Sequence, residues 1–157
     1  MILGQVFNPK TICVNLESVE KEEVFEELVE KLIAFKPNLN RQNILNAIME
    51  RENLMSTGIK EGIAVPHGKT NEVEEVIGVL GISKNGIDYD ALDNKPVHLV
   101  FLLLSSSDNA EFHLRVLRHL STLIESSGFV AELMDQKDSH GVYQVICRYD
   151  RELNYTN

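Results

Sequence analysis

A proline–histidine–glycine triplet at positions 66–68 is the part of this sequence best suited to chemistry. It follows a short apolar run, Gly62 to Val65, which is typical of a buried strand. A histidine between proline and glycine has a restricted backbone and an uncrowded approach. Neutral imidazole has a free ring nitrogen near pH 7, so His67 is a candidate nucleophile. The alternative is an ordinary loop histidine that follows a strand.

Arg51, sixteen positions before His67, is the second candidate. Its guanidinium is always charged and presents a fork of donors that matches the oxygens of a phosphate. The sequence thus contains a candidate nucleophile and, sixteen positions before it, a side chain suited to binding a phosphate. The spacing alone does not bring the two side chains together, so the elements that carry them have to do so.

His113 is the third candidate, because it falls on the apolar side of a predicted helix over residues 110–125. At about 100° per residue it lies within roughly 20° of the centre of the apolar stripe, whereas His119 lies roughly 100° away. The stripe consists of Val116, Leu117, Leu120, Leu123 and Ile124. An inward polar residue in a first turn, next to the end of a strand, is typical of ligand sites in α/β sheets. The alternative is a core histidine bonded to a backbone carbonyl.

The surrounding pattern alternates helices and strands. Ser18 is a plausible N-cap for a helix over 20–35, and Asn40 for a second helix that ends near Arg51. The other predicted elements are strands at 11–16, 62–65, 75–82 and 97–104, the helix at 110–125, and shorter helices at 129–135 and 140–148. The run at 97–104 is uninterrupted and apolar, as in a central strand covered on both faces. The sequence predicts an α/β fold: a single domain over 1–157 with a mixed sheet and helices on both faces.

Composition excludes several classes of protein. The net charge of −9 argues against binding a nucleic-acid backbone and is compatible with a basic protein partner. No apolar run approaches the roughly 20 residues of a membrane span, and the N-terminus lacks the features of a signal peptide, so a cytoplasmic location is expected. No HExxH pair predicts zinc and no Gly-rich GxxxxGK[ST] loop predicts direct use of ATP. No metal or organic cofactor is expected.

The segment STGIKEGIAVPHGKT, preceded by Arg51 and Glu52, closely resembles the phosphorylation-site region of enzyme IIA of the bacterial phosphotransferase system, fructose/mannitol type. A nitrogen-regulatory branch shares that pattern. Residues 18–33 resemble the first helix of the family, residues 86–104 its central strand region, and His113 with the following leucines its next helix. The resemblance covers most of the chain from about residue 12 to 125 in the family's order.

The resemblance implies that His67 accepts a phosphoryl group from the histidine phosphocarrier protein and passes it to a IIB domain. In sugar transport, IIB then phosphorylates a sugar carried by a membrane IIC component. His113 would lie beside His67 to orient it and stabilise charge. Arg51 would hold phosphoryl oxygens, and Thr57 is a further possible hydroxyl donor. The chain itself would be a phosphotransferase with no direct membrane insertion.

Two functions remain open on this basis, and a third is disfavoured. The first is a sugar-specific phosphotransferase component, favoured because the first helix and the GIDYDALDNKPVHL stretch look more like the sugar branch. The second is a nitrogen-type regulatory phosphoprotein that controls protein partners through the same histidine. The third, a binding domain that has lost phosphorylation, is disfavoured because Arg51, His67 and His113 are all present.

Overall fold

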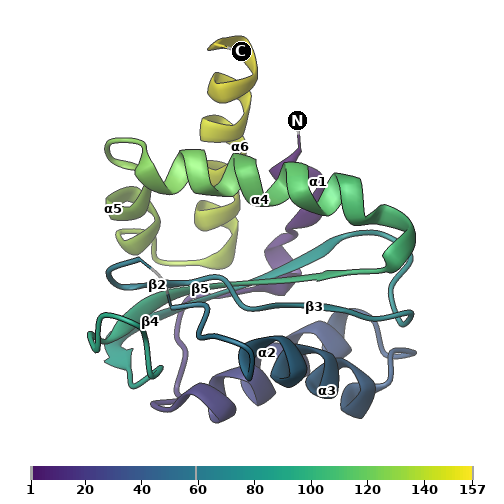
Figure 1. Ribbon diagram of the computed structural model, residues 1–157. Helices are drawn as coiled ribbons and strands as arrows, with labels where there is room; N and C mark the ends of the chain where they lie inside the picture. Colours follow the sequence, from purple (N-terminus) through teal and green to yellow (C-terminus); the bar gives the residue numbers. More distant parts are fainter. Residues whose placement is uncertain (1, 59, 157) are drawn as a thin grey trace.

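The structure, a computed structural model, describes residues 2–58 and 60–156, so that Met1 and Asn157 of the predicted domain, and Ile59, lie outside the described residues. In the described part, five strands form one mixed sheet in the order β1-β4-β5-β2, and β3 also pairs with β5 (Figure 1). The strands are β1 (Ile12–Cys13), β2 (Ile63–Ala64), β3 (His67–Lys69), β4 (Ile77–Ile87) and β5 (Val97–Ser105). β4 and β5 are antiparallel, whereas β1 runs parallel to β4 and both β2 and β3 run parallel to β5.

Helices cover both faces of this sheet, as predicted (Figure 1). One face carries α2 (Lys21–Phe35) and α3 (Arg41–Glu52). The other carries α1 (Leu3–Val6), α4 (Ala110–Glu125), α5 (Phe129–Met134) and α6 (Ser139–Thr156). The result is a three-layer α/β/α arrangement with β5 at its centre.

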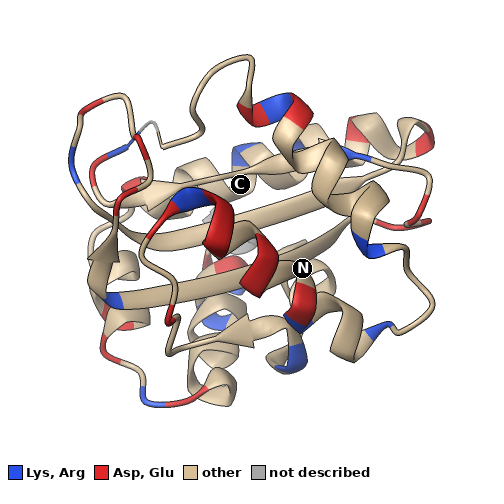
Figure 2. Ribbon diagram, turned by 90° about the horizontal axis from the view of Figure 1, so that it is seen from below, with Lys and Arg blue, Asp and Glu red and all other residues tan. Residues whose placement is uncertain are grey.

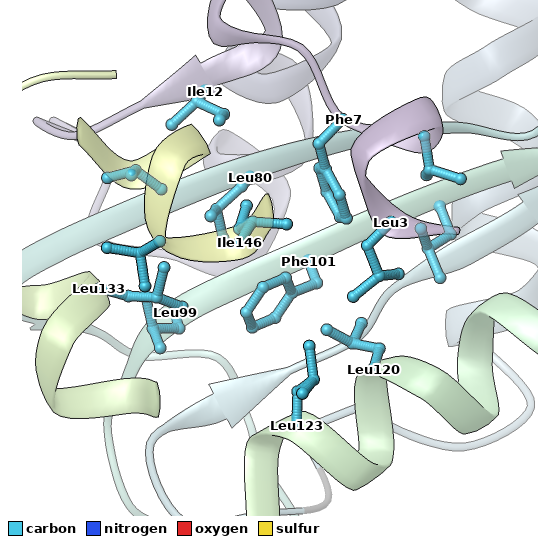
Figure 3. Packing of buried hydrophobic residues seen from close by; sticks show 14 of the residues in the cluster. Leu3, Phe7, Ile12, Leu80, Leu99, Phe101, Leu120, Leu123, Leu133 and Ile146 are labelled. Carbon is cyan, nitrogen blue, oxygen red and sulfur yellow. The ribbon is translucent and has the colours of Figure 1, made fainter. Parts of the chain in front are cut away.

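The apolar run of β5 feeds both layers of packing. Successive side chains of a strand point to opposite faces. Leu99, Phe101 and Leu103 accordingly join the core under α1, α4, α5 and α6, while Val100, Leu102 and Leu104 join the core against α2 and α3. In the first core, Phe101 meets Phe7 edge to face at 6.2 Å, with Leu120 and Leu123 of α4 nearby (Figure 3). Every residue of β5 except His98 is buried, which explains why its sequence does not alternate.

The two helices on the α2–α3 side turn apolar side chains toward the sheet. Val24, Phe25, Leu28 and Leu32 of α2 are all buried. The predicted N-cap of α2 is wrong. Glu20 occupies the N-cap position, and Ser18 instead donates its hydroxyl proton to Glu27 at 2.5 Å.

The start of α3 is as predicted. The side chain of Asn40 accepts a hydrogen bond from the backbone N–H of Asn43 at 3.0 Å and caps the helix. The helix continues to Glu52, so Arg51 lies in its last turn. Its inward side is formed by Ile44 and Ile48, which are fully buried.

Several element boundaries differ from those predicted. The strand expected at 11–16 is only Ile12–Cys13, because Thr11 closes a 3-10 turn, Pro9–Thr11, capped by Asn8. β4 begins later and extends to Ile87, past a register shift after Ile82. Its added residues include exposed polar ones, which carry no strand periodicity.

The last helix is much longer than the predicted 140–148, since α6 runs to Thr156. No glycine or proline follows Gly141, so nothing in the sequence stops the helix. Asp150 is fully buried, and its carboxylate accepts a hydrogen bond from the backbone N–H of Gly4 at 3.1 Å. The second half of α6 is thereby joined to α1.

Acidic residues concentrate on the outer side of the α2–α3 layer, the side from which Figure 2 shows the molecule. The first turn of α2 contributes Glu22 and Glu23. Among the described residues, no helix combines the length and the apolar character needed to cross a membrane.

Candidate functional site

His67 is the first residue of β3, whereas the sequence placed it in the loop just after the strand predicted at 62–65. β3 runs parallel to β5, with His67 opposite Leu103. The glycine that follows has a specific packing role. A Cβ on Gly68 would lie 2.9 Å from the carbonyl carbon of Ala47, in the backbone of α3. Glycine therefore lets α3 approach β3 closely, and this brings the last turn of α3 to His67.

The imidazole of His67 is half-buried and has a defined tautomer. Its Nδ1 lies 3.0 Å from the carbonyl oxygen of Val65. A carbonyl can only accept, so Nδ1 carries the proton and the neutral ring keeps its lone pair on Nε2. Burial lowers the pKa of His67, the Val65 carbonyl opposes this effect and the charge of Arg51 reinforces it, with a net lowering. The ring is therefore neutral at pH 7, with Nε2 available as a nucleophile.

His113 lies beside His67, in the first turn of α4. The two ring centroids are 5.6 Å apart, with the ring planes tilted by 48°. The residue is only 6% exposed, as its place on the apolar stripe predicted. Burial, followed by the positive charges of His67 and Lys69, lowers the pKa of His113 to about 4. Among the described residues its Nδ1 has no hydrogen-bond partner, although the atom is buried.

Arg51 and His67 line the same cavity, which has a volume of about 350 Å³. Ala47, Leu54 and Lys69 complete most of its wall. One guanidinium nitrogen of Arg51, Nη1, donates to the carbonyl oxygen of Met55 at 2.9 Å. That bond holds one edge of the guanidinium and leaves its other donors for a ligand. Sequence positions 51, 67 and 113 thus converge at one end of β3.

Thr57 lies in a buried polar cluster with Glu52 and Tyr89. Its hydroxyl donates to Oε1 of Glu52 at 2.6 Å and lies 2.8 Å from the hydroxyl oxygen of Tyr89. Its backbone N–H donates to Oε2 of Glu52 at 2.8 Å. The suggested role of Thr57 as a donor to phosphate stays a prediction. In this structure its hydroxyl donates its hydrogen bond to Glu52.

Glu52 was not singled out from the sequence, although it directly follows Arg51. It is 6% exposed, and Lys21 forms an ion pair with its Oε2 at 3.0 Å. Burial would raise the pKa of Glu52, but the hydrogen bonds from Thr57 and the charge of Lys21 outweigh it and lower the pKa. A glutamate in the last turn of a helix is electrostatically unfavourable, and this is the one local signal that could have marked it.

The remaining histidines lie outside this cluster. His98 lies in β5, and its Nδ1 lies 2.9 Å from the carbonyl oxygen of Ser83. His119 lies 3.8 Å from the buried carboxylate of Asp150. His140 is exposed at the start of α6. In residues 2–58 and 60–156, no three His, Cys, Asp or Glu side chains are grouped so that they could hold a metal ion.

Comparison with known proteins places this fold and site in a family. Residues 5–149 match the family model described as "Phosphoenolpyruvate-dependent sugar phosphotransferase system, EIIA 2". The chain therefore belongs to the EIIA type-2 family, the fructose/mannitol type, as the sequence resemblance indicated.

Individual relatives fall on both sides of the family. The chain is 36% identical over 151 residues to the "PTS system fructose-specific EIIABC component" of Bacillus subtilis, covering 96% of this chain but 24% of that protein. It is 29% identical over 146 residues to a "Nitrogen regulatory protein" of Bradyrhizobium diazoefficiens, covering 93% of this chain and 95% of that one.

Solved structures show the same fold. The nitrogen regulatory protein IIA-Ntr of Neisseria meningitidis superposes with a TM-score of 0.85 at 27% identity, covering 93% of this chain and 99% of that one. The mannitol enzyme IIA of Escherichia coli, solved in complex with phosphorylated enzyme IIB, superposes with a TM-score of 0.75 at 20% identity. That match covers 90% of this chain and 99% of the other, and at this identity it speaks for the fold alone.

Proposed function

We propose that this protein carries a phosphoryl group on Nε2 of His67, accepts it from the histidine phosphocarrier protein and passes it to a IIB domain. The observation that carries the proposal is the hydrogen bond from Nδ1 of His67 to the Val65 carbonyl, in a ring that shares its cavity with Arg51. Membership of the EIIA type-2 family supports the same reaction. We place this exchange in the cytoplasm.

The chemistry follows from the tautomer. The lone pair on Nε2 attacks phosphorus while the phosphorus–nitrogen bond to the donor's histidine breaks. No proton has to leave Nε2, because the ring proton is on Nδ1. Positive charge builds on the ring as the new bond forms, and the Val65 carbonyl, 3.0 Å from Nδ1, stabilises it. A phosphoramidate formed in this way is reactive enough to be passed on to a second protein.

The transferring group spreads negative charge over three oxygens, and the protein's main task is to position and stabilise it. Arg51 supplies a fixed positive charge in the cavity. His113 supplies a neutral imidazole 5.6 Å from His67, centroid to centroid. Once a phosphoryl group with a charge of about −2 arrives, protonation of His113 becomes more favourable.

Sugar transport is the role we favour, with the IIB domain acting for a membrane IIC component. The fructose-specific Bacillus subtilis relative, at 36% identity, supports it. The alternative is a nitrogen-regulatory phosphoprotein that controls protein partners. It has its own support, since the chain covers 95% of the Bradyrhizobium diazoefficiens nitrogen regulatory protein and only 24% of the fructose protein.

Phosphorylation in a reconstituted relay tests the shared chemistry. The protein is incubated with phosphoenolpyruvate, enzyme I and the histidine phosphocarrier protein, and its intact mass is measured. We expect one added phosphoryl group in the wild type and in His140→Ala, an exposed-histidine control, and none in His67→Ala. Acid-labile phosphate on His67→Ala would refute the proposal.

The two branches separate at the next step. Phosphorylated wild-type protein is offered to a purified fructose-type IIB domain, and the loss of phosphate from His67 is followed over time. The transport role predicts rapid transfer to the acceptor. A phosphorylated protein that does not react with IIB, yet changes its binding to other proteins with phosphorylation state, would favour the regulatory role.

A further inference from the structure

A buried carboxylate beside the site has no part in the chemistry proposed so far. Glu52 is the last residue of α3, directly after Arg51. The carboxylate is held by Lys21 of α2, by Thr57 and by Tyr89, three contacts from separate parts of the chain. An acidic residue at a helix C-terminus is disfavoured by the helix dipole, and its burial costs the solvation free energy of its charge. Its contacts have to outweigh both effects for it to remain there.

A continuous series of hydrogen bonds leads from Glu52 to His67. The backbone N–H of Thr57 donates to the Glu52 carboxylate at 2.8 Å. The carbonyl of Thr57 accepts from the N–H of Val65 at 3.1 Å. The carbonyl of Val65 in turn accepts from Nδ1 of His67 at 3.0 Å. The carbonyl of Val65, which selects the tautomer of His67, is thus connected to Glu52 through one residue, Thr57.

A second branch leads from Glu52 to Arg51 through the segment 53–57. Arg51 donates to the carbonyl of Met55, which lies in this segment. The outer part of the segment is open to solvent, with Leu54 80% exposed and Met55 53% exposed. It is attached at its start to the end of α3 and at its end to Glu52 through Thr57. The bond from Thr57 to Glu52 therefore restrains the segment that contains Met55, whose carbonyl accepts from Arg51.

We propose that Glu52 is a positioning residue of the His67 site. Its carboxylate fixes Thr57, and through Thr57 it fixes both the Val65 carbonyl that holds Nδ1–H of His67 and the Met55 carbonyl that holds Arg51. The effect on phosphoryl transfer rests on the proposed function of His67, whereas the effect on the tautomer of His67 does not.

Two variants of the same carboxylate cluster separate positioning from packing. Glu52→Leu removes both carboxylate oxygens with little change in volume, so the N–H of Thr57 and Lys21 lose the oxygen that they share. Tyr89→Phe removes a different hydrogen bond to the same carboxylate, 3.2 Å long, and leaves the bond from Thr57 N–H to Glu52 intact. Both variants disturb one buried cluster, but only the first interrupts the path to His67.

The first readout is the tautomer of His67, measured from the nitrogen-15 shifts of its two ring nitrogens above its pKa. We expect the Nδ1–H form to dominate in the wild type and in Tyr89→Phe, and a mixture with the Nε2–H form in Glu52→Leu. A wild-type tautomer in folded Glu52→Leu would overturn the proposal. This readout stands even if the wild type proves not to accept phosphate, an outcome that would refute only the proposed function.

The second readout is the rate of phosphorylation by the phosphocarrier protein, with kcat and KM measured separately. Glu52→Leu is expected to lower kcat about ten-fold or more with KM little changed, because Nε2 and Arg51 are misplaced and the docking surface is not. Tyr89→Phe should keep its kcat. Equal losses of kcat in the two variants would reduce Glu52 to a packing residue and overturn the proposal.

Thr57 gives an independent check should Glu52→Leu fail to fold. Glu52 holds Thr57 by two bonds, one from its backbone N–H and one from its hydroxyl. Thr57→Ser keeps both bonds, whereas Thr57→Val removes the hydroxyl bond with little change in volume and leaves the N–H in place. We expect the serine variant to retain the wild-type tautomer of His67 and the valine variant to lose it in part. Identical ring-nitrogen spectra for the two would contradict the proposed path.

Discussion

The imidazole rings of His67 and His113 lie 5.6 Å apart, and the two residues come from opposite kinds of element, the first residue of a strand and the first turn of a helix. Both rings have a lowered pKa, so both are neutral at pH 7 and Nε2 of His67 holds no proton that would block its attack on phosphorus. The two rings differ in the hydrogen bonding of Nδ1. Nδ1 of His67 is bonded to a carbonyl, whereas Nδ1 of His113 has no partner among the described residues.

His113→Ala is expected to leave His67 able to accept phosphate and to slow the onward transfer, by about ten-fold or more. The neighbouring imidazole stabilises the charge of the phosphoryl group but is not the nucleophile. Mapping the phosphorylated residue in the wild type and in each single histidine variant checks the division of roles. Phosphate found on His113, with His67 intact and unmodified, would mean that the two roles are reversed.

Arg51→Ala should slow phosphoryl transfer about ten- to hundred-fold, because a charge-assisted contact with phosphate is typically worth about 1.5–3 kcal/mol. Its effect on the melting temperature should be small, since Arg51 is only partly buried and its bond to the carbonyl of Met55 is exposed, so that the loss of this bond costs little. Arg41→Ala, at the other end of α3, is the control, because it removes an exposed ion pair with Glu30 far along the same helix. Equal transfer rates for the two variants would exclude Arg51 from the site.

Gly68→Ala tests whether the approach of α3 to β3 sets the site. The new Cβ would lie 2.9 Å from a backbone atom of Ala47, so the helix itself has to move, at a cost of about 1–3 kcal/mol. Arg51 lies one turn further along that helix and would move with it. We expect a lower melting temperature together with slower phosphorylation.

The control for this variant is Gly141→Ala, in α6. There the added Cβ meets the end of the flexible Gln136 side chain, at 2.6 Å from Oε1, and the side chain can turn away. It should keep both stability and phosphorylation rate. Wild-type behaviour of Gly68→Ala would show that close packing of α3 on β3 is not required.

The stability of the protein should fall as the pH is lowered from about 6.5 to 4. The unfolded chain binds a proton on His113 near pH 6.5, whereas the folded protein resists it until about pH 4. The unfolded state therefore binds more protons in this window, which costs the folded state on the order of 2 kcal/mol by pH 5. Denaturant unfolding at pH 7, 6 and 5 measures this cost.

His113→Asn should flatten the dependence between pH 6.5 and 5, while the exposed His140→Asn should not. Below about pH 4.5 a second loss is expected from Glu52, whose lowered pKa means that its contribution disappears as the carboxylate is protonated. An unchanged slope in His113→Asn would show that His113 titrates normally in the folded protein.

The helices were the most predictable part of the fold, because their apolar residues recur with the helical period. The bounds of α4 agree with those predicted, and α3 begins at its asparagine cap. β3 was not predicted, since a strand that is three residues long and contains glycine has no period of its own. It forms because β5 offers it parallel hydrogen bonds beside β2.

The site residues also differ in how far the sequence could predict them. His67, Arg51 and His113 could be found because the family pattern contains them, and the inward position of His113 followed from the helical angle as well. Glu52 had a single local signal, its acidic side chain in the last turn of a helix, because its partners Lys21 and Tyr89 are 31 and 37 positions away and only the folded chain brings them together. Thr57 was noticed for its hydroxyl, yet its backbone N–H and carbonyl carry the path to His67.

The most direct test of the account is the identification of the phosphorylated atom. Protein labelled with nitrogen-15 in its histidine rings is phosphorylated in the reconstituted relay and kept at alkaline pH, and the phosphorus–nitrogen coupling and the ring-nitrogen shifts are measured by NMR. The account predicts a single phosphohistidine, with phosphorus on Nε2 of His67 and a proton still on Nδ1. Phosphorus on Nδ1 of His67, or on either nitrogen of His113, would contradict it.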